Sequence, residues 1–328
     1  MLCAPKPSMT IAEPSQDTAA SGLIAPHGGV LVDLMVPADQ RDGVRASADR
    51  RVECSDRNAC DVELLVVGGF SPLRGFMHQE DYEAVVGGHR TSSGLLFGLP
   101  IVFDSDEEEI AIGERLLLTY RGQELAVLTV ESRWEPDKVK EAQGCYGTTS
   151  LEHPAVRMIA GERGRYYIGG RVQGLELPQR VFPCKTPAEV NNPRIRWAYL
   201  PYSMHMAGPR EALQHMIIRK NYGCTHFIIG RDMAGCKSSL SGEDFYGPYE
   251  AQDFARDHAS ELGMETVPSL NLVYTEEEGY VTAEHAEARG LHVRKLSGTQ
   301  FRQMLRGGEE IPEWFAFRSV VEVLRAAA

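Results

Sequence analysis

The stretch CTHFIIGRDMAG, residues 224–235, decides the fold. Its first half is a short apolar run that ends at Gly230, which is typical of a strand buried in a parallel sheet. Its second half is a turn between two glycines that carries Arg231 and Asp232. Because open parallel sheets bind ligands beyond the carboxyl ends of their strands, a site is first expected at this turn.

Helix signals lie on both sides of this strand. Upstream, MAGPREALQHMIIRKNYG (206–223) has Pro209 near its start and Gly223 as its stop, with apolar residues spaced for one helix face. Downstream, a helix is predicted from Tyr249 to Leu262, followed by a strand over 264–270. Strand, helix and strand in alternation predict a right-handed α/β sheet.

The C-terminal part begins a new helix with a capping signal. Ser297 and Gln300 stand at the spacing of a capping box, directly before FRQMLRGG (301–308). A last amphipathic helix is predicted from Ser319 to Arg325.

The first half of the chain consists of short β-like runs divided by Gly and Pro. These runs are GGVLVDLMV (28–36), ELLVVGGF (63–70), LLFGLPIVF (95–103), RLLLTY (115–120), ELAVLTVES (124–132) and RYYIGGRVQGL (165–175). Their spacing favours a small mixed β-barrel or sandwich. We therefore expect a disordered leader at 1–22, a β domain at 23–185 and an α/β domain at 186–328.

The composition is that of a folded protein with an acidic balance. A chain of 328 residues, 43% of them hydrophobic, can bury one large core or two modest ones. Its 34 Lys and Arg against 46 Asp and Glu give a net charge of -12, which argues against nucleic acid as a partner. No apolar run approaches the roughly 18 residues that a membrane helix needs, so no membrane contact is expected.

Cysteine usage and the leader bear on the compartment. The seven cysteines are scattered and form no CxxC pair, which indicates a reducing compartment and no protein-bound metal. The leader is rich in Ala, Ser, Thr and Pro, as in an organellar transit peptide, but it lacks Arg and contains Glu13 and Asp17, which weakens that interpretation. We expect a cytoplasmic protein, with the plastid as the alternative.

The turn at 230–235 combines groups that suit phosphate or sulfate. Arg231 offers planar bidentate donors, and a turn between glycines exposes backbone N–H groups. An ordinary Arg–Asp surface turn is the alternative. A P-loop is rejected, because Cys236 stands between Gly235 and Lys237 and a poor helix former follows.

Two other places offer contacts for an anion. Arg210 lies in the first turn of its predicted helix, where the helix dipole disfavours a cation unless an anion compensates, so a ligand contact is expected. Ser297 and Thr299 begin a helix with Arg302 one turn later, which suits a second anion site. Ordinary capping explains Ser297 equally well.

Several long sequence words carry a resemblance to a known family. They are GGFSPLRGFM (68–77), MAGPREALQHMIIRKNYGCTHFIIGRDMAG (206–235), FYGPYEAQDFA (245–255) and KLSGTQFRQMLRGGEEIPEWFAF (295–317). In this order they resemble ATP sulfurylase, from about Leu23 to Leu324. The resemblance implies a PUA-like β domain followed by a Rossmann-like nucleotidyltransferase α/β domain. It also implies conversion of ATP and sulfate to adenosine 5′-phosphosulfate and diphosphate, the first step of sulfate assimilation, with Mg²⁺ bound to ATP and a homo-oligomeric enzyme.

The resemblance also implies roles for individual residues. Gly230, Arg231, Asp232 and Met233 would line the nucleotide, although Met233 stands where many relatives have His. Arg231 would face phosphate and sulfate and act in catalysis with Arg210. The other implied contacts are Ala234 through its N–H to sulfate, Leu272 near adenine, and Ser297, Thr299 and Arg302 as a second phosphate-binding motif.

One segment departs from the family pattern. Relatives carry a strand ending in Gln-x-Arg-Asn-Pro and then His-x-x-His, whereas here TPAEV runs directly into NNPRIRWAYL between Val190 and Asn191. The sequence therefore predicts an internal deletion of several tens of residues. Loss of a central strand would expose apolar neighbours in a parallel sheet. The alternative to a working enzyme is thus an inactive family member or a truncated gene model or splice product, with very low turnover expected.

Overall fold

A computed structural model describes residues 23–179 and 200–327. The chain divides into two compact units, Met1–Pro268 and Ser269–Ala328, and each is described by itself. The expected leader at 1–22, the domain junction at 185/186 and the deletion point at 190/191 lie outside the described residues.

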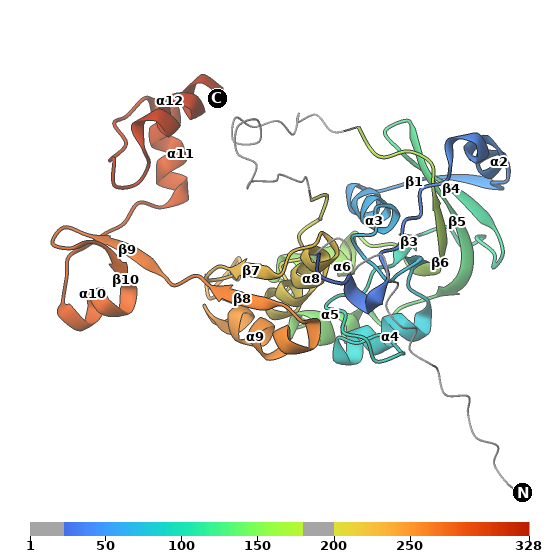
Figure 1. The fold of residues 1–328 in the computed structure, drawn as a ribbon, viewed down its shortest axis with the longest axis horizontal. Helices are drawn as coiled ribbons and strands as arrows, with labels where there is room; N and C mark the ends of the chain where they lie inside the picture. Colours follow the sequence, from blue (N-terminus) through green and yellow to red (C-terminus); the bar gives the residue numbers. More distant parts are fainter. Residues whose placement is uncertain (1–22, 180–199, 328) are drawn as a thin grey trace, which may run out of the picture. The chain divides into compact units, whose positions relative to one another are not determined.

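The first unit contains a six-stranded sheet (Figure 1). Its strands are β1 (Arg50–Glu53), β2 (Gly75–Phe76), β3 (Phe103–Ser105), β4 (Arg115–Tyr120), β5 (Gln123–Trp134) and β6 (Tyr166–Gly174). The order is β1-β4-β5-β6-β2, and β3 also pairs with β6. β1 is parallel to β4, and the other pairs are antiparallel. The strands predicted at 115–120, 124–132 and 165–175 are confirmed.

Three other predicted strands are wrong, and one of them, LLFGLPIVF, has only an isolated bridge at Leu96 and the first residue of β3 at Phe103. The first half of ELLVVGGF belongs to helix α3 (Asp56–Val66) and the second half is a turn, because Ser55 caps the helix: its hydroxyl accepts the Asn58 N–H at 3.1 Å. GGVLVDLMV forms only an isolated bridge between Met35 and Gly174. A short apolar run fits a buried helix as well as a buried strand, so the spacing of its apolar residues could not distinguish the two.

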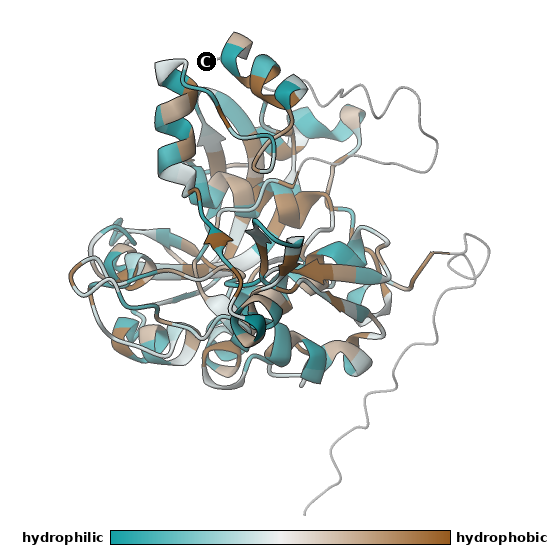
Figure 2. Ribbon diagram, turned by 90° about the vertical axis from the view of Figure 1, so that its left-hand side faces the viewer, coloured by the Kyte–Doolittle hydropathy of each residue, from teal (hydrophilic) through white to brown (hydrophobic). Residues whose placement is uncertain are grey.

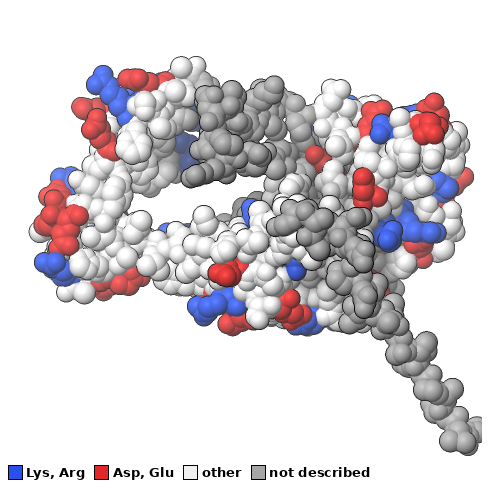
Figure 3. Space-filling model, viewed as in Figure 1, with Lys and Arg blue, Asp and Glu red and all other residues white. Residues whose placement is uncertain are grey.

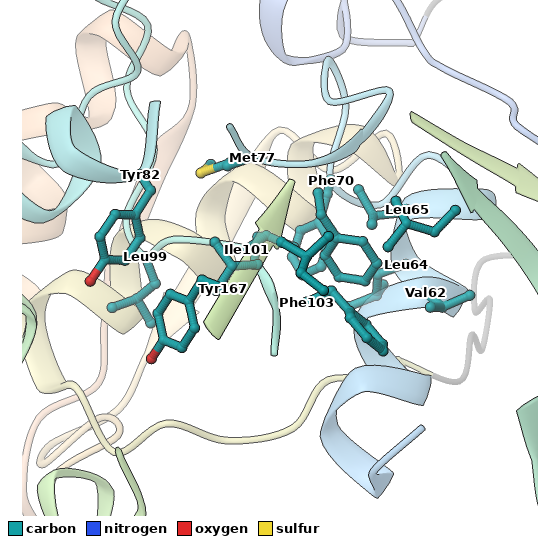
Figure 4. Packing of buried hydrophobic residues seen from close by; sticks show 14 of the residues in the cluster. Val62, Leu64, Leu65, Phe70, Met77, Tyr82, Leu99, Ile101, Phe103 and Tyr167 are labelled. Atoms are coloured by element: carbon teal, nitrogen blue, oxygen red, sulfur yellow. The ribbon is translucent and has the colours of Figure 1, made fainter. Parts of the chain in front are cut away.

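Helices pack around this sheet and complete its core. They are η1 (His27–Gly29), η2 (Ala38–Gln40), α2 (Arg41–Ala46), α4 (Gln79–Gly88), α5 (Lys138–Tyr146) and α6 (Pro154–Gly161), besides α3. Figure 4 shows Phe70 and Phe103 among the leucines of α3, with Tyr82 and Tyr167 farther along the same cluster. In Figure 2 the helices alternate between hydrophobic and hydrophilic residues, as expected when one face covers a core.

The rest of the first unit has the predicted strand–helix–strand order. Its elements are α8 (Gly208–Asn221), β7 (His226–Ile229), α9 (Glu250–Leu262) and β8 (Glu265–Pro268). β7 and β8 pair in parallel, from His226 opposite Glu265 to Ile229 opposite Pro268. Both predicted helices and the central strand are therefore confirmed.

The expectation that β7 is buried on both faces is wrong for the described residues. Phe227 and Ile229 are buried with α8 and α9, whereas Ile228 is 68% exposed and Val267 of β8 is 41% exposed. The physical reason is that the parallel sheet has only two described strands, with both helices' apolar residues gathered on one side. The other side presents aliphatic side chains to solvent.

Arg210 attaches α8 to the β domain. Its guanidinium is buried and donates to the carbonyl oxygens of Gly98 (2.9 Å), Val86 (3.0 Å), Gly144 (2.5 Å) and Val85. Burial lowers the Arg210 pKa. The close approach requires Gly98, since a Cβ there would lie 2.3 Å from the Arg210 carbonyl oxygen. The ligand contact expected for Arg210 is thus replaced by backbone acceptors, which occupy all three guanidinium nitrogens.

The second unit is small. It comprises β9 (Leu272–Thr275), β10 (Gly279–Thr282), α10 (Ala283–Arg289), β11 (Val293–Arg294), α11 (Gly298–Gly307) and α12 (Arg318–Ala327). The three strands form an antiparallel sheet in the order β10-β9-β11. The capping box of Ser297 and Gln300 at the start of α11 is confirmed, as is the terminal helix. None of the helices in the described ranges has the length and apolar character needed to cross a membrane.

Removing the cap of α3 should weaken the β domain. We expect Ser55→Ala to lower the free energy of unfolding by about 1 kcal/mol, because the Asn58 N–H loses its acceptor. Urea denaturation measures this. The control is Ser260→Ala on an exposed position of α9, which should leave stability equal or slightly higher. Equal loss in both variants would contradict the capping role.

Removing the Arg210 guanidinium should have a larger effect. Arg210→Met leaves four buried carbonyl groups without this donor, so we expect at least about 3 kcal/mol of destabilisation. Arg256→Met, an exposed arginine of α9 paired only with Asp253, is the control and should change stability by less than about 0.5 kcal/mol. A folded Arg210→Met protein with unchanged stability would refute the attachment.

Candidate functional site

The turn after β7 is held in an unusual backbone conformation. Asp232 and Ala234 have φ of 55° and 52°, a region that non-glycine residues rarely adopt. Three hydrogen bonds fix the turn: Asp232 N–H to the Pro248 carbonyl (2.9 Å), Gly235 N–H to the Asp232 carbonyl (3.0 Å), and Gly208 N–H to the Ala234 carbonyl (3.0 Å). The last bond connects the turn directly to the start of α8.

Arg231 and Asp232 form an ion pair at this turn. The distance from the Arg231 Nη1 to the Asp232 Oδ2 is 2.7 Å, and the side chains are 46% and 36% exposed. An exposed pair of this kind contributes little to stability, so the guanidinium can exchange its partner for a ligand. Of the two alternatives left open by the sequence, the structure shows the surface ion pair, and the oxyanion contact stays a prediction.

A small hollow of about 130 Å³ lies beside the turn. Its lining residues are Asp232, Met233, Gly235, Cys236, Lys237, Asp244, Tyr246, Gly247 and Ala251. This volume is well below the roughly 300 Å³ or more of a pocket for a whole organic ligand. It suits a single tetrahedral oxyanion.

The hollow contains three functional candidates that the sequence reasoning did not single out. Lys237 Nζ pairs with Asp244 Oδ2 at 3.0 Å. Tyr246 Oη donates to the Tyr146 carbonyl at 3.1 Å, which ties this loop to α5. The family word FYGPYEAQDFA contains Tyr246, and that word was the available signal.

Ala234 belongs to the same turn but is not among the residues that line the hollow. The side chain is buried, and its carbonyl accepts from Gly208. Among residues 23–179 and 200–327, no acceptor lies at hydrogen-bonding distance from the Ala234 N–H. The contact of this amide with sulfate, which the family resemblance implies, stays a prediction.

The remaining predicted contacts belong to the second unit. Ser297 Oγ accepts the Gln300 N–H at 3.2 Å, and the Gln300 side chain returns a bond to the Ser297 N–H at 2.9 Å. Arg302 donates to Thr299 Oγ1 at 3.4 Å. Leu272, at the start of β9, is 61% exposed. The structure brings Ser297, Thr299 and Arg302 together at one helix start, whereas Gly230 to Ala234 form a separate group in the first unit.

Charges on the molecular surface are mixed in sign. Figure 3 shows Lys and Arg interspersed with Asp and Glu on the face in view. Within the described parts of the chain, no group of three or more His, Cys, Asp or Glu side chains is arranged to hold a metal ion. The turn therefore offers local positive groups rather than an extended basic surface.

Comparison with known proteins identifies both halves of the chain. A family model described as PUA-like domain matches residues 24–177, and one described as ATP-sulfurylase matches residues 185–327. A solved structure described as a hexameric APS kinase from Thiobacillus denitrificans has the same fold, with a TM-score of 0.66, 22% identity, and coverage of 93% of this chain and 68% of that one.

Curated relatives agree with the family models. Sulfate adenylyltransferases of Phaeosphaeria nodorum and Neurospora crassa are each 35% identical to this chain, over 92% of it and 67% of the relative. That of Schizosaccharomyces pombe is 36% identical over 84% of this chain and 72% of the relative. The chain, a PUA-like domain followed by a nucleotidyltransferase domain, belongs to the sulfate adenylyltransferase (ATP sulfurylase) family.

Proposed function

We propose that this chain transfers the adenylyl group of ATP to sulfate, which yields adenosine 5′-phosphosulfate and diphosphate. The observation that carries this proposal is the fixed turn at the carboxyl end of a parallel strand, which carries Arg231 and Ala234 and of which Asp232, Met233 and Gly235 line a hollow of oxyanion size. Family membership supplies the substrates, and the geometry supports the place where they bind.

The reaction needs orientation and charge neutralisation more than a protein nucleophile. A sulfate oxygen attacks the α-phosphorus in line, and diphosphate leaves with the electron pair of the broken P–O bond. In this proposal the Ala234 N–H holds sulfate, and Arg231 leaves Asp232 to contact the phosphate oxygens. Gly230 and Met233 line the nucleotide on either side of that cation.

A nucleotide-binding role is proposed separately for residues of the second unit. Ser297, Thr299 and Arg302 gather at the start of α11, where unpaired backbone N–H groups favour phosphate. The exposed side chain of Leu272 offers an apolar surface for adenine. Mg²⁺ is proposed to arrive bound to ATP, as the family resemblance implies, since the part of the chain that the structure describes holds no group of three or more His, Cys, Asp or Glu arranged for a metal ion.

A second candidate function is nucleotide binding without efficient turnover. The match to the Phaeosphaeria relative extends over 383 residues, whereas 92% of this chain is about 302 residues, so about 80 aligned residues of the relative have no counterpart here. The exposed face of Ile228 and Val267 supports the loss of a neighbouring strand. Both cations beside the turn, Arg231 and Lys237, are already paired with carboxylates.

A homo-oligomer of this chain is part of the proposal. Support for it is limited to the family and to the hexameric description of the structurally similar protein. The partners proposed for the site itself are ATP, sulfate, adenosine 5′-phosphosulfate and diphosphate.

The binding half of the proposal is tested with Arg231→Gln. Loss of a charge-assisted contact should weaken binding of ATP and adenosine 5′-phosphosulfate by roughly tenfold or more. Titration calorimetry measures this, with Arg256→Gln as an exposed control that should bind like the wild type. Equal affinities in wild type and Arg231→Gln would exclude the turn as the phosphate contact.

The catalytic half is tested by diphosphate release. A working enzyme releases diphosphate only when ATP and sulfate are both present. If the second candidate is correct, the chain binds nucleotide but releases almost no diphosphate. A version with the relatives' segment inserted between Val190 and Asn191 then releases diphosphate about 100-fold faster or more. Strong release by the unmodified chain would dismiss the second candidate.

A further inference from the structure

The sheet of the β domain has two differently covered faces. One face carries Leu116, Leu128 and Val172 into the main core. On the other face, Leu117, Val127 and Leu175 form a small apolar cluster with Val44 and Ala48, from α2 and the residues after it. This cluster covers only part of the second face.

The strand register places polar side chains beside the small cluster. Arg115 of β4 lies opposite Thr129 of β5, and Thr129 lies opposite Arg171 of β6. Neighbouring strands are about 4.8 Å apart, so the three side chains form one row on one face, with the two arginines about 10 Å apart at their Cα atoms. Side chains of arginine are long enough to converge across that distance.

This row borders a cavity of about 370 Å³. Its lining residues are Leu34, Arg74, Arg115, Thr129, Arg171, Val172 and Gln173. Three of the seven are arginines, and none is acidic, although the whole chain has a net charge of -12. The volume lies in the range of sites for small organic ligands.

The arginines are only partly neutralised by the protein. Arg171 Nε pairs with Glu131 at 2.6 Å. Arg115 donates from Nη2 to Gln173 Oε1 at 2.8 Å, while its Nε is shielded from solvent and has no partner. The nearby carboxylate of Asp49 accepts the Arg115 backbone N–H at 2.9 Å and does not line the cavity.

Arg74 completes the set from another segment. Its carbonyl accepts the Val172 N–H at 3.1 Å, which fixes its backbone beside β6. Arg74 is exposed and lines the cavity, and within residues 23–179 and 200–327 its guanidinium has no recorded ion pair or hydrogen bond. Two of the three guanidinium groups therefore face the cavity without a carboxylate of the protein.

We propose that this cavity is a second oxyanion site, which binds a small phosphorylated or sulfated molecule through Arg74, Arg115 and Arg171. Arginine presents planar paired donors that match the oxygens of such groups, and the Thr129 hydroxyl and Gln173 amide add neutral donors. The site shares no residue with the turn after β7, so it does not depend on the proposed adenylyl transfer.

The test is titration calorimetry of the full chain with inorganic phosphate and, separately, diphosphate at constant ionic strength. We expect Arg74→Gln and Arg115→Gln each to weaken binding of at least one anion by about tenfold. Arg165→Gln, an exposed arginine of the same domain paired with Glu135, is the matched control and should bind like the wild type. Preference for diphosphate would indicate an extended ligand, and equal binding a single oxyanion; both support the site.

Two further measurements keep the result interpretable. Thermal melts of the unliganded variants establish folding, and the exposed Arg74 variant alone decides the matter if Arg115→Gln fails to fold. Arg231→Gln should retain this binding, which separates it from the proposed nucleotide site. The inference is overturned if neither anion binds the wild type, or if Arg74→Gln binds the anions as tightly as Arg165→Gln does. It is also overturned if the heat of anion binding is lost only in Arg231→Gln.

Discussion

The architecture depends on one buried cation. The Arg210 guanidinium sits among carbonyl oxygens from three segments of the β domain, and this contact fixes the first turn of α8. The first residue of α8, Gly208, in turn donates its N–H to the Ala234 carbonyl. The strained turn that would hold the anion is therefore positioned by a bond network that begins in the β domain. A charge buried in this way is stable only because each of its nitrogens has an acceptor.

Because of the Arg210 contact, the β domain and the α/β part together hold the turn after β7 in place. The α/β part has only two described parallel strands, and one face of this sheet is exposed at Ile228. Apolar side chains are therefore buried against only one face of it. The Arg210 contact and the Tyr246 hydroxyl on the Tyr146 carbonyl both tie it to the larger β-domain core. Backbone strain at Asp232 and Ala234 persists because these surrounding bonds determine it.

Sequence reasoning succeeded where one signal dominated. The helix stops at Gly223 and Gly263, the capping box at Ser297, and the alternating strands β4 to β6 were all readable, because each has a local physical cause. The ELLVV run was misread since its apolar residues fit either a strand or a helix, and the cap at Ser55 lay eight residues upstream of Glu63. Arg210 was misjudged because its acceptors are more than 60 residues away in the chain. The arginine row of Arg115 and Arg171 depends on strand register, which the sequence does not give.

We propose that the turn at 230–235 is an oxyanion cradle of a nucleotide site. Hydrogen–deuterium exchange of the peptide covering residues 230–237, with and without adenosine 5′-phosphosulfate, tests it most directly. We expect slower exchange in the presence of the ligand, with the Ala234 amide among those protected. Unchanged exchange of this peptide at saturating ligand would contradict it.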